Sequence, residues 1–350
     1  MAIQASRGSY ARLVPLVSKS RPRLHPQRLL PTHRFSSTEA TSVFPARYEN
    51  TTTLPDGRTL AWAEAGNLDG HPIFFLHGFP GSRLEARGVE EIGKRHGIRF
   101  ICPDRPGYGR SSFYPEQTIA DWPGDMQSLA NHLKLDRYGV FGGSGGGPYV
   151  LACAREIPSS KLSGVGVVCI AAPWEAGTRE LQWYRHPVSA AATRTPGLLT
   201  KLLDSTLALL HKYAATEGGK KYLDAIAARA AKTAGKQKEV SAEAAQTPEA
   251  VAARRERFLR IFAEPFAGGT RGFVRDAYLL SHPWGFRLED IRCDRRIQIW
   301  HGVRDVNSPI AMVRYMADRL PNCDLHELEG EDHFTIIKHL EMMLSKLVKT

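Results

Sequence analysis

Short apolar or β-branched runs recur along the chain and alternate with segments of helical periodicity. Such runs, bounded by glycine and polar residues, are typical of strands, and a strand covered on both faces is apolar almost throughout. The predicted strands are residues 50–54, 59–65, 73–76, 98–102, 138–141, 165–170, 297–300 and 324–328. Helices are predicted at 119–133, from Ser308 and Pro309 to Leu320, and from Phe334 onward. This alternation predicts an α/β fold with a mostly parallel, doubly wound sheet.

The strand pattern stops in the middle of the chain. Between 174 and 286 no run resembles a strand, and the pattern is helical. Its part from 222 to 264 is rich in alanine and charge, which is more typical of a solvated helix face than of a lipid or nucleic-acid site. We therefore expect a sheet-bearing core at 45–173 and 287–350, with a helical insertion at 174–286. Residues 1–44 are expected to precede the core as a transit peptide and disordered tail.

The composition is that of an ordinary globular protein. Its 350 residues can form one large or two smaller domains, and 42% of them are hydrophobic and 24% charged. No apolar run approaches the length of about 18 residues that a membrane span needs. The five cysteines are an odd number and show no C-x-x-C spacing. They are therefore expected to be buried free thiols rather than disulfides or a zinc site.

The net charge of +11 is concentrated at the start of the chain. Seven basic residues and no acidic residue precede Glu39, and removing these seven charges lowers the net charge from +11 to +4. The excess is thus a basic tail and does not predict a nucleic-acid-binding face. A basic, serine-rich segment without acids is typical of a mitochondrial presequence, and Arg34-Phe35-Ser36-Ser37 resembles a processing site. The expected location is mitochondrial; a merely disordered tail on a cytoplasmic protein is the alternative.

One glycine-rich turn carries the strongest chemical signal. The predicted strand 138–141 runs into Gly142-Gly143-Ser144-Gly145-Gly146, and a helix with Pro148 in its first turn follows. A serine between a strand and a helix matches the G-x-S-x-G nucleophile elbow, where small residues two before and two after the serine let strand and helix pack closely. The helix N-terminus also favours a developing negative charge near the Ser144 hydroxyl.

A serine hydroxyl needs a base to take its proton and a carboxylate to orient that base. Asp305 follows one predicted strand and His333 follows the next, in the chain order serine, acid, histidine. Asp305 could instead cap the helix near Ser308, and Asp332 or Glu331 could be the carboxylate. Because these two acids are next to His333 in sequence, a triad geometry is difficult for them, and Asp305 is the better candidate.

Several motifs together resemble the α/β-hydrolase superfamily, from about Pro45 to the C-terminus. They are His-Gly-Phe-Pro-Gly at 77–81, Asp-Arg-Pro-Gly-Tyr-Gly-Arg-Ser at 104–111 and Ser-His-Pro-Trp-Gly-Phe at 281–286, which are similar to segments of its capped members. The resemblance implies that the helical insertion is a cap over the carboxyl edge of the sheet. A serine at the elbow excludes the members that attack through an aspartate.

The resemblance also assigns roles to individual residues. It implies that Ser144 is the nucleophile, His333 the base and Asp305 the orienting acid. The backbone N–H groups of Phe79 and Gly145 would form the oxyanion hole.

Other polar and aromatic residues near these motifs have plainer interpretations. His77 is expected to hold the oxyanion loop, His301 to be a packed polar residue, and Asp104 and Ser111 to be structural. A group of aromatic residues flanks the insertion and either lines a pocket or belongs to the core. These residues are Trp174, Trp183, Tyr184, Trp284 and Phe286.

The sequence therefore predicts a serine hydrolase that cleaves a carboxylic ester of small-molecule size through an acyl-enzyme, with no metal and no organic cofactor. The same apparatus would serve amide or N-terminal proline cleavage, thioester hydrolysis and C–C bond hydrolysis, so these reactions stay open. A catalytically silent hydrolase fold acting as a binding module is a further alternative, against which the intact set of Ser144, Asp305 and His333 argues.

Overall fold

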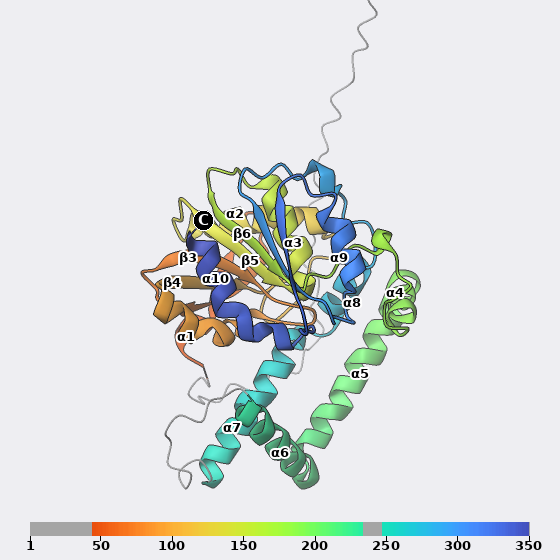
Figure 1. Ribbon diagram of the computed structural model, residues 1–350. Coiled ribbons are helices and arrows are strands. Elements are labelled where there is room, and N and C mark those ends of the chain that lie inside the picture. The colour runs from red at the N-terminus through yellow and green to blue at the C-terminus, as the bar shows by residue number, and fades with distance from the viewer. Residues whose placement is uncertain (1–43, 234–246, 350) are drawn as a thin grey trace, which may run out of the picture. The chain divides into compact units, whose positions relative to one another are not determined.

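The structure is a computed structural model that describes residues 44–233 and 247–349. Its centre is one eight-stranded sheet with the strand order β1-β2-β4-β3-β5-β6-β7-β8. Figure 1 labels β3 to β6 of this sheet and shows the helices around it. The strands are β1 (Asn50–Thr53), β2 (Thr59–Gly66), β3 (His71–Leu76), β4 (Ile98–Pro103), β5 (Tyr138–Gly143), β6 (Leu162–Val168), β7 (Ile297–Gly302) and β8 (Cys323–Leu328). Every predicted strand is present, and all pairs are parallel except β1–β2 and β2–β4. The predicted fold class is confirmed.

Ten α-helices lie in the described residues. They are α1 (Ala86–His96), α2 (Trp122–His132), α3 (Gly147–Glu156), α4 (Arg185–Arg194), α5 (Pro196–Ala215), α6 (Glu217–Thr233), α7 (Pro248–Ala263), α8 (Arg271–Leu279), α9 (Ile310–Ala317) and α10 (Leu340–Lys349). Short 3-10 helices connect or extend them, among them η1 (Ala46–Tyr48), η2 (Arg83–Glu85), η4 (Ser144–Gly146), η5 (Trp174–Ala176), η7 (Glu264–Phe266) and η9 (Thr335–His339).

Two of the predicted helices differ in detail from the observed ones. The helix expected to be capped by Ser308 begins at Ile310 and ends at Ala317, short of Leu320. The Ser308 hydroxyl does not cap it, because its oxygen accepts the backbone N–H of Ala172 at 3.1 Å. The helix expected from Phe334 onward starts as the 3-10 helix η9 and becomes α-helical only at Leu340.

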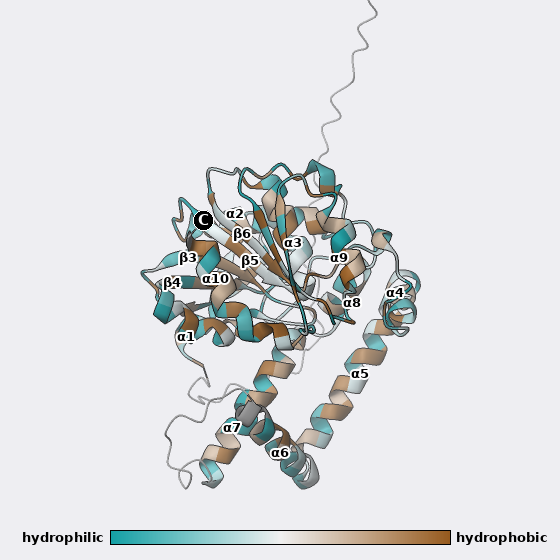
Figure 2. Cartoon of the chain, viewed as in Figure 1, coloured by the Kyte–Doolittle hydropathy of each residue, from teal (hydrophilic) through white to brown (hydrophobic). Residues whose placement is uncertain are grey.

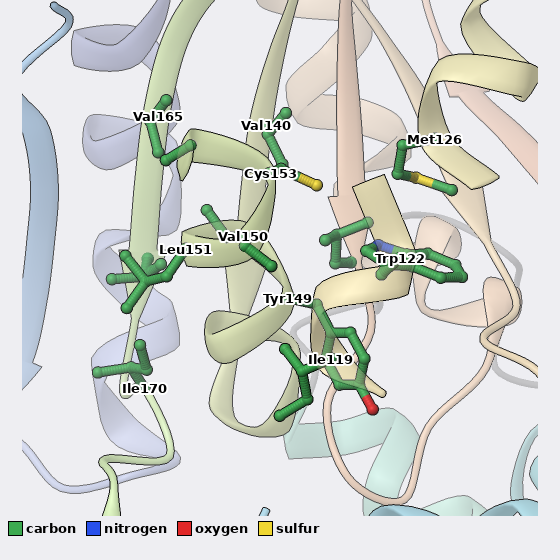
Figure 3. Packing of buried hydrophobic residues seen from close by; sticks show 14 of the residues in the cluster. Ile119, Trp122, Met126, Val140, Tyr149, Val150, Leu151, Cys153, Val165 and Ile170 are labelled. Carbon is green, nitrogen blue, oxygen red and sulfur yellow. The ribbon is translucent and has the colours of Figure 1, made fainter. Parts of the chain in front are cut away.

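Helices cover both faces of the sheet. On one face α2, α3 and α9 pack in the larger hydrophobic cluster, and on the other α1 and α10 pack in a second cluster. Neighbouring residues of β5 point to opposite faces, with Val140 in the first cluster and Phe141 in the second. Figure 3 shows Val150 and Leu151 of α3 among buried side chains of the first cluster. Figure 2 shows that hydrophobic residues are frequent on the central strands of the sheet.

The chain between β6 and β7 contains α4 to α8, and its described residues include no strand. Helix α8 contacts the loop after β4 closely, since a side chain at Gly272 would place its Cβ 2.5 Å from the carbonyl oxygen of Gly107. Helix α5, by contrast, has no buried residue and exposes Leu198, Leu202 and Leu209. Helix α8 is thus one place where the insertion contacts the core closely.

Two further expectations concern single residue types. All five cysteines are free, four of them are buried, and Cys323 is half-buried, as expected for thiols in apolar elements. No helix in the described part of the chain is long and apolar enough to cross a membrane. The segment predicted as transit peptide and tail, residues 1–44, lies outside the described residues except for its last residue, Phe44, which is buried.

Candidate active site

The predicted elbow has the geometry that its sequence requires. Ser144 follows β5 directly, opens η4, and has a left-handed φ of 49°, a conformation that costs a non-glycine residue free energy. A Cβ at Gly146 would lie 2.4 Å from the carbonyl oxygen of Leu76, and one at Gly142 would lie 2.9 Å from a methyl carbon of Val150. Only glycine fits at these two positions, so the turn can hold Ser144 at the carboxyl edge of the sheet.

Ser144, His333 and Asp305 form one chain of hydrogen bonds. His333 Nε2 lies 3.1 Å from Ser144 Oγ, and His333 Nδ1 lies 2.7 Å from Asp305 Oδ2. Because an ionised carboxylate only accepts, Nδ1 carries the proton and Nε2 is free to accept the serine O–H. Three residues separated by as many as 189 positions in the chain are thereby brought together.

The Asp305 carboxylate is buried, with 3% of the residue exposed, yet well satisfied. Its other oxygen, Oδ1, accepts the backbone N–H groups of Asn307 at 2.8 Å and Ser308 at 3.0 Å. Burial opposes ionisation, but the hydrogen bond and charge of His333, with His301 and the backbone N–H of Ser308, outweigh it and lower the Asp305 pKa. The side chain therefore stays ionised while it orients the imidazole.

The rival carboxylates have other partners. Asp332 Oδ1 accepts the backbone N–H groups of Phe334 and Thr335, both at 2.8 Å, and so caps the start of η9. Glu331 forms ion pairs with Lys338 at 2.6 Å and with His339 at 3.1 Å. Neither acid has a hydrogen bond to His333 among the described residues. Asp305 meets both descriptions offered by its sequence, since it holds the histidine and caps the turn before α9.

The loop after β3 lies against the elbow. A Cβ at Gly145 would be 3.3 Å from the backbone nitrogen of Phe79, and one at Gly78 would be 3.7 Å from Ser144 Cβ. The backbone nitrogens of Phe79 and Gly145 are thus near each other, beside the serine. This arrangement suits a pair of N–H donors for a developing oxyanion.

His77 holds this loop, as its sequence position suggests. Its Nε2 accepts the backbone N–H of Arg105 at 3.1 Å, so Nδ1 carries the proton and donates to the Gly78 carbonyl at 2.9 Å. Burial, together with the charge of Arg105, lowers the His77 pKa well below its ordinary value, which keeps the ring neutral. Asp104 and Ser111 are structural, since Asp104 pairs with Arg83 at 2.9 Å and Ser111 Oγ donates to the Asp104 carbonyl.

Cys169 is a site neighbour that the sequence analysis did not single out. It follows β6 with a left-handed φ of 46°, and its sulfur lies within 4.8 Å of the nearest ligand atoms of Asp305 and His333. Such a trio could in principle bind a metal. However, burial and the charge of Asp305 raise the Cys169 pKa, and a protonated thiol is a poor ligand. Its position directly after a strand, like that of Ser144, is the signal that could have identified it.

The aromatic residues around the insertion divide into two groups. Trp284 is 5% exposed and belongs to the larger hydrophobic cluster, and Phe286 packs against that cluster. Trp174 is half-buried and packs against the same cluster, with its ring centroid 5.2 Å from that of His186, and Tyr184 is exposed. Trp183, at 80% exposure, is on the surface. Trp174 is therefore a half-buried aromatic residue at the start of the insertion, where a contact with a bound molecule can be tested.

Comparisons with known proteins bear on the family and on the fold. The sequence model of the alpha/beta hydrolase fold matches residues 71–340. A proline iminopeptidase from Arabidopsis thaliana is 32% identical over 141 residues, which is 39% of this chain and 36% of that protein. Lipase 3 from a Moraxella species is 30% identical over 131 residues, which is 36% of this chain and 40% of the lipase. The chain thus spans less than half of the length of these curated relatives.

Solved structures share the fold over most of the chain. A putative aryl esterase from Burkholderia cenocepacia matches with a TM-score of 0.56 and 18% identity, over 86% of this chain and 98% of that one. A thermophilic esterase from Thermogutta terrifontis matches with a TM-score of 0.50 and 21% identity, over 86% of this chain and 95% of that one. At such identities the likeness concerns the fold alone.

Proposed function

This chain belongs to the alpha/beta hydrolase fold family, and we propose that it is a hydrolase that cleaves carboxylic esters through an acyl-enzyme formed on a serine. The observation that carries the proposal is the hydrogen-bond chain from Ser144 Oγ through His333 to the buried Asp305. An imidazole held by an ionised carboxylate is the base that a serine hydroxyl needs.

In the first half of the reaction, Ser144 Oγ attacks the ester carbonyl carbon while its proton moves to His333 Nε2. The carbonyl oxygen gains negative charge and accepts the backbone N–H groups of Phe79 and Gly145. Asp305 stabilises the imidazolium through Nδ1. Collapse of the intermediate expels the alcohol, which takes the proton from Nε2, and leaves Ser144 acylated.

In the second half, water enters the place of the alcohol and gives a proton to His333 Nε2. The resulting hydroxide attacks the acyl carbon, and the same two N–H groups stabilise the second oxyanion. Cleavage of the acyl bond returns the proton to Ser144 and releases the carboxylic acid. At the end of the reaction Ser144 and His333 have regained their starting protonation states, so the enzyme is ready for another ester.

We propose further that the helices within 174–286 act as a cap that selects the substrate. Support comes from their place in the chain, between β6 and β7, whose carboxyl ends precede Cys169 and Asp305. The half-buried Trp174 at the start of the insertion and the contact of α8 with the loop after β4 give the segment access to the same edge of the sheet.

Labelling with a fluorophosphonate tests the proposal. The wild-type protein should gain one phosphonyl group, which peptide mass spectrometry should locate on Ser144, and the Ser144→Ala variant should gain none. Hydrolysis of p-nitrophenyl esters from acetate to decanoate should be lost in the same variant. A folded wild-type protein that is neither labelled nor active would instead be a binding module.

The iminopeptidase relatives favour one second candidate, release of an N-terminal proline. The triad would serve an amide as well as an ester, and the difference would reside in recognition of the substrate amine. Comparison of kcat/KM for proline p-nitroanilide and for the p-nitrophenyl esters decides between the two. A higher value for the anilide would reassign the protein to aminopeptidase chemistry.

A further inference from the structure

A buried arginine donates hydrogen bonds to backbone carbonyl groups in the loop of the proposed oxyanion hole. Arg105 follows β4 and is 1% exposed. Its Nη1 donates to the carbonyl oxygen of His77 at 2.5 Å, and its Nη2 donates to that of Gly78 at 2.9 Å. One planar guanidinium thus fixes two successive peptide groups, a geometry that a lysine ammonium cannot reproduce.

The partner of this arginine comes from the inserted segment. Asp276 of α8 is 2% exposed, and its Oδ2 accepts Arg105 Nε at 3.1 Å and Nη2 at 2.9 Å. Its other oxygen accepts the hydroxyl of Tyr149 at 2.5 Å, from the helix that follows Ser144. The Tyr149 and Tyr108 ring centroids lie 4.8 Å and 5.3 Å from the Arg105 guanidinium carbon. The ion pair of Arg105 and Asp276 is therefore buried between the two tyrosine side chains and the loop after β3.

The Gly78 carbonyl has a special place in this loop. It belongs to the same planar peptide group as the N–H of Phe79, and this peptide bond is trans. In a trans peptide the C=O and the N–H point in opposite directions, so a bond that fixes one fixes the other. A cationic donor on the carbonyl oxygen also polarises the group and strengthens its N–H as a donor.

We propose that Arg105 and Asp276 are a positioning pair, by which helix α8 of the insertion fixes and polarises the Phe79 N–H of the oxyanion hole. The proposal rests on the proposed function of that N–H group. Asp276 is needed because an unpaired buried guanidinium would rearrange to reach water or another acid. The pair links the insertion to the reacting carbonyl without either side chain contacting the substrate.

The Arg105→Lys variant tests the pair. It keeps the positive charge but cannot hold both carbonyls and Asp276 in one plane. We expect kcat on p-nitrophenyl butyrate to fall about 100-fold, as for loss of an oxyanion donor, with KM changed less than about twofold. The inhibition constant of a butyl trifluoromethyl ketone, whose serine adduct carries an oxyanion, should rise by a similar factor.

Arg83→Lys is the matched control. Arg83 is equally buried and pairs with Asp104, Glu264 and Glu49, but it has no hydrogen bond to the carbonyls of His77 or Gly78. The Arg83→Lys variant should have a lower unfolding temperature. Its kcat and its inhibition constant for the trifluoromethyl ketone should stay within about twofold of the wild-type values. Equal kinetic effects of the two substitutions would overturn the proposal, as would an Arg105→Lys effect confined to KM.

Asp276→Asn provides a second route, because it keeps the size of the side chain and removes its charge. This variant should show a lower kcat and, in parallel, a higher inhibition constant for the ketone, each by about 10-fold or more. An unchanged inhibition constant would contradict the proposed role of the pair. Tyr149→Phe, which removes only one bond to Asp276, should change both quantities in the same sense by about threefold. Absence of fluorophosphonate labelling in the wild-type protein would refute the proposed function, whereas a labelled wild type with unaffected variants would refute the pair alone.

Discussion

Asp305 divides its two carboxylate oxygens between two tasks. Oδ2 holds the imidazole of His333, and Oδ1 holds the backbone turn that leads into α9. An amide at this position could keep only one of these arrangements, because its NH₂ group cannot accept. Either the imidazole tautomer or the turn would have to change.

This division gives a prediction for Asp305→Asn. Turnover of p-nitrophenyl butyrate should fall by about 10³-fold or more, because the amide favours the wrong imidazole tautomer, while circular dichroism should show a folded protein. Asp332→Asn is the control and should reduce turnover less than about threefold, since Asp332 bonds to backbone N–H groups of η9. The opposite order of effects would transfer the orienting role to Asp332.

Among single residues, the sequence predicted best those that belong to a short local motif or lie just after a strand. The G-x-S-x-G pattern identifies Ser144 as a candidate because the strained turn needs glycine at fixed offsets. Asp305 and His333 lie in the loops that follow β7 and β8. Arg105 and Asp276 could not be paired in this way. The two residues are 171 positions apart, and no sequence motif links them. Their pairing is therefore visible only in the structure, where α8 packs against the core.

At the scale of elements, a network of charges joins the start of the core to the insertion. Glu49, just after η1, accepts Arg83 Nη2 at 2.8 Å and Arg110 Nη1 at 2.6 Å, and its other oxygen accepts Arg260 Nη2 of α7 at 2.8 Å. Arg83 also binds Glu264 of η7. These contacts hold four segments that are far apart in the sequence.

The network gives a pH-dependent prediction. Burial opposes ionisation of Glu49, but its arginine partners outweigh this effect, so its folded pKa is lowered from 4.5. A lowered acid pKa stabilises the fold above the unfolded value and loses that contribution as the pH falls through the folded one. Glu49→Gln should therefore lower the free energy of unfolding by about 2 kcal/mol at pH 7.

Urea unfolding followed by tryptophan fluorescence measures this difference, which should shrink below a pH of about 4.5. Glu91→Gln, in an exposed pair with Lys94, should change stability little at either pH. A Glu49→Gln effect that is equally large at pH 3.5 would show that packing, not charge, holds the segments together.

The start of the insertion gives a second prediction at this scale. If Trp174 contacts the acyl chain, Trp174→Ala should change the ratio of kcat/KM for p-nitrophenyl acetate and decanoate by about 10-fold. The rate of fluorophosphonate labelling should stay within about threefold. Trp183→Ala, at an 80% exposed position, should alter neither quantity, and an unchanged ratio in both variants would place Trp174 in the core.

Elements were predicted best where burial leaves a continuous pattern. All strands were predicted because each is an apolar or β-branched run bounded by turn residues. Helix α1 was not, because most of its residues are polar and only Ala86, Val89 and Gly93 are buried, so no apolar run marks it in the sequence. Ser308 was misjudged as a helix cap because its hydroxyl oxygen accepts the N–H of Ala172, 136 positions away.

At the scale of the whole molecule, the described core begins with Phe44. This residue is 4% exposed and stacks on Tyr48 at a centroid distance of 6.2 Å. Processing near Ser36 would leave that contact intact. We propose, from the seven basic residues before Glu39, that the first part of the chain is a mitochondrial presequence.

Two measurements test the proposed location. A fusion of residues 1–45 to a fluorescent protein should enter mitochondria, and protein sequencing should find the mature N-terminus near Ser36. Removal of residues 1–36 should leave ester turnover within about twofold, whereas removal through Phe44 should lower the unfolding temperature. A cytosolic fusion with an unprocessed protein would leave the cytoplasmic alternative.

The strands β6 and β7 are neighbours in the sheet, although the entire insertion separates them in the chain. Bringing them together requires closure of the longest loop of the fold, which has a larger entropic cost than the short connections that precede it. During synthesis, Ser144 emerges from the ribosome long before Asp305 and His333 do. The proposed nucleophile therefore has no base until the further 189 residues that lead to His333 have been made. The proposed hydrolytic activity should thus be the final property that a newly made molecule acquires.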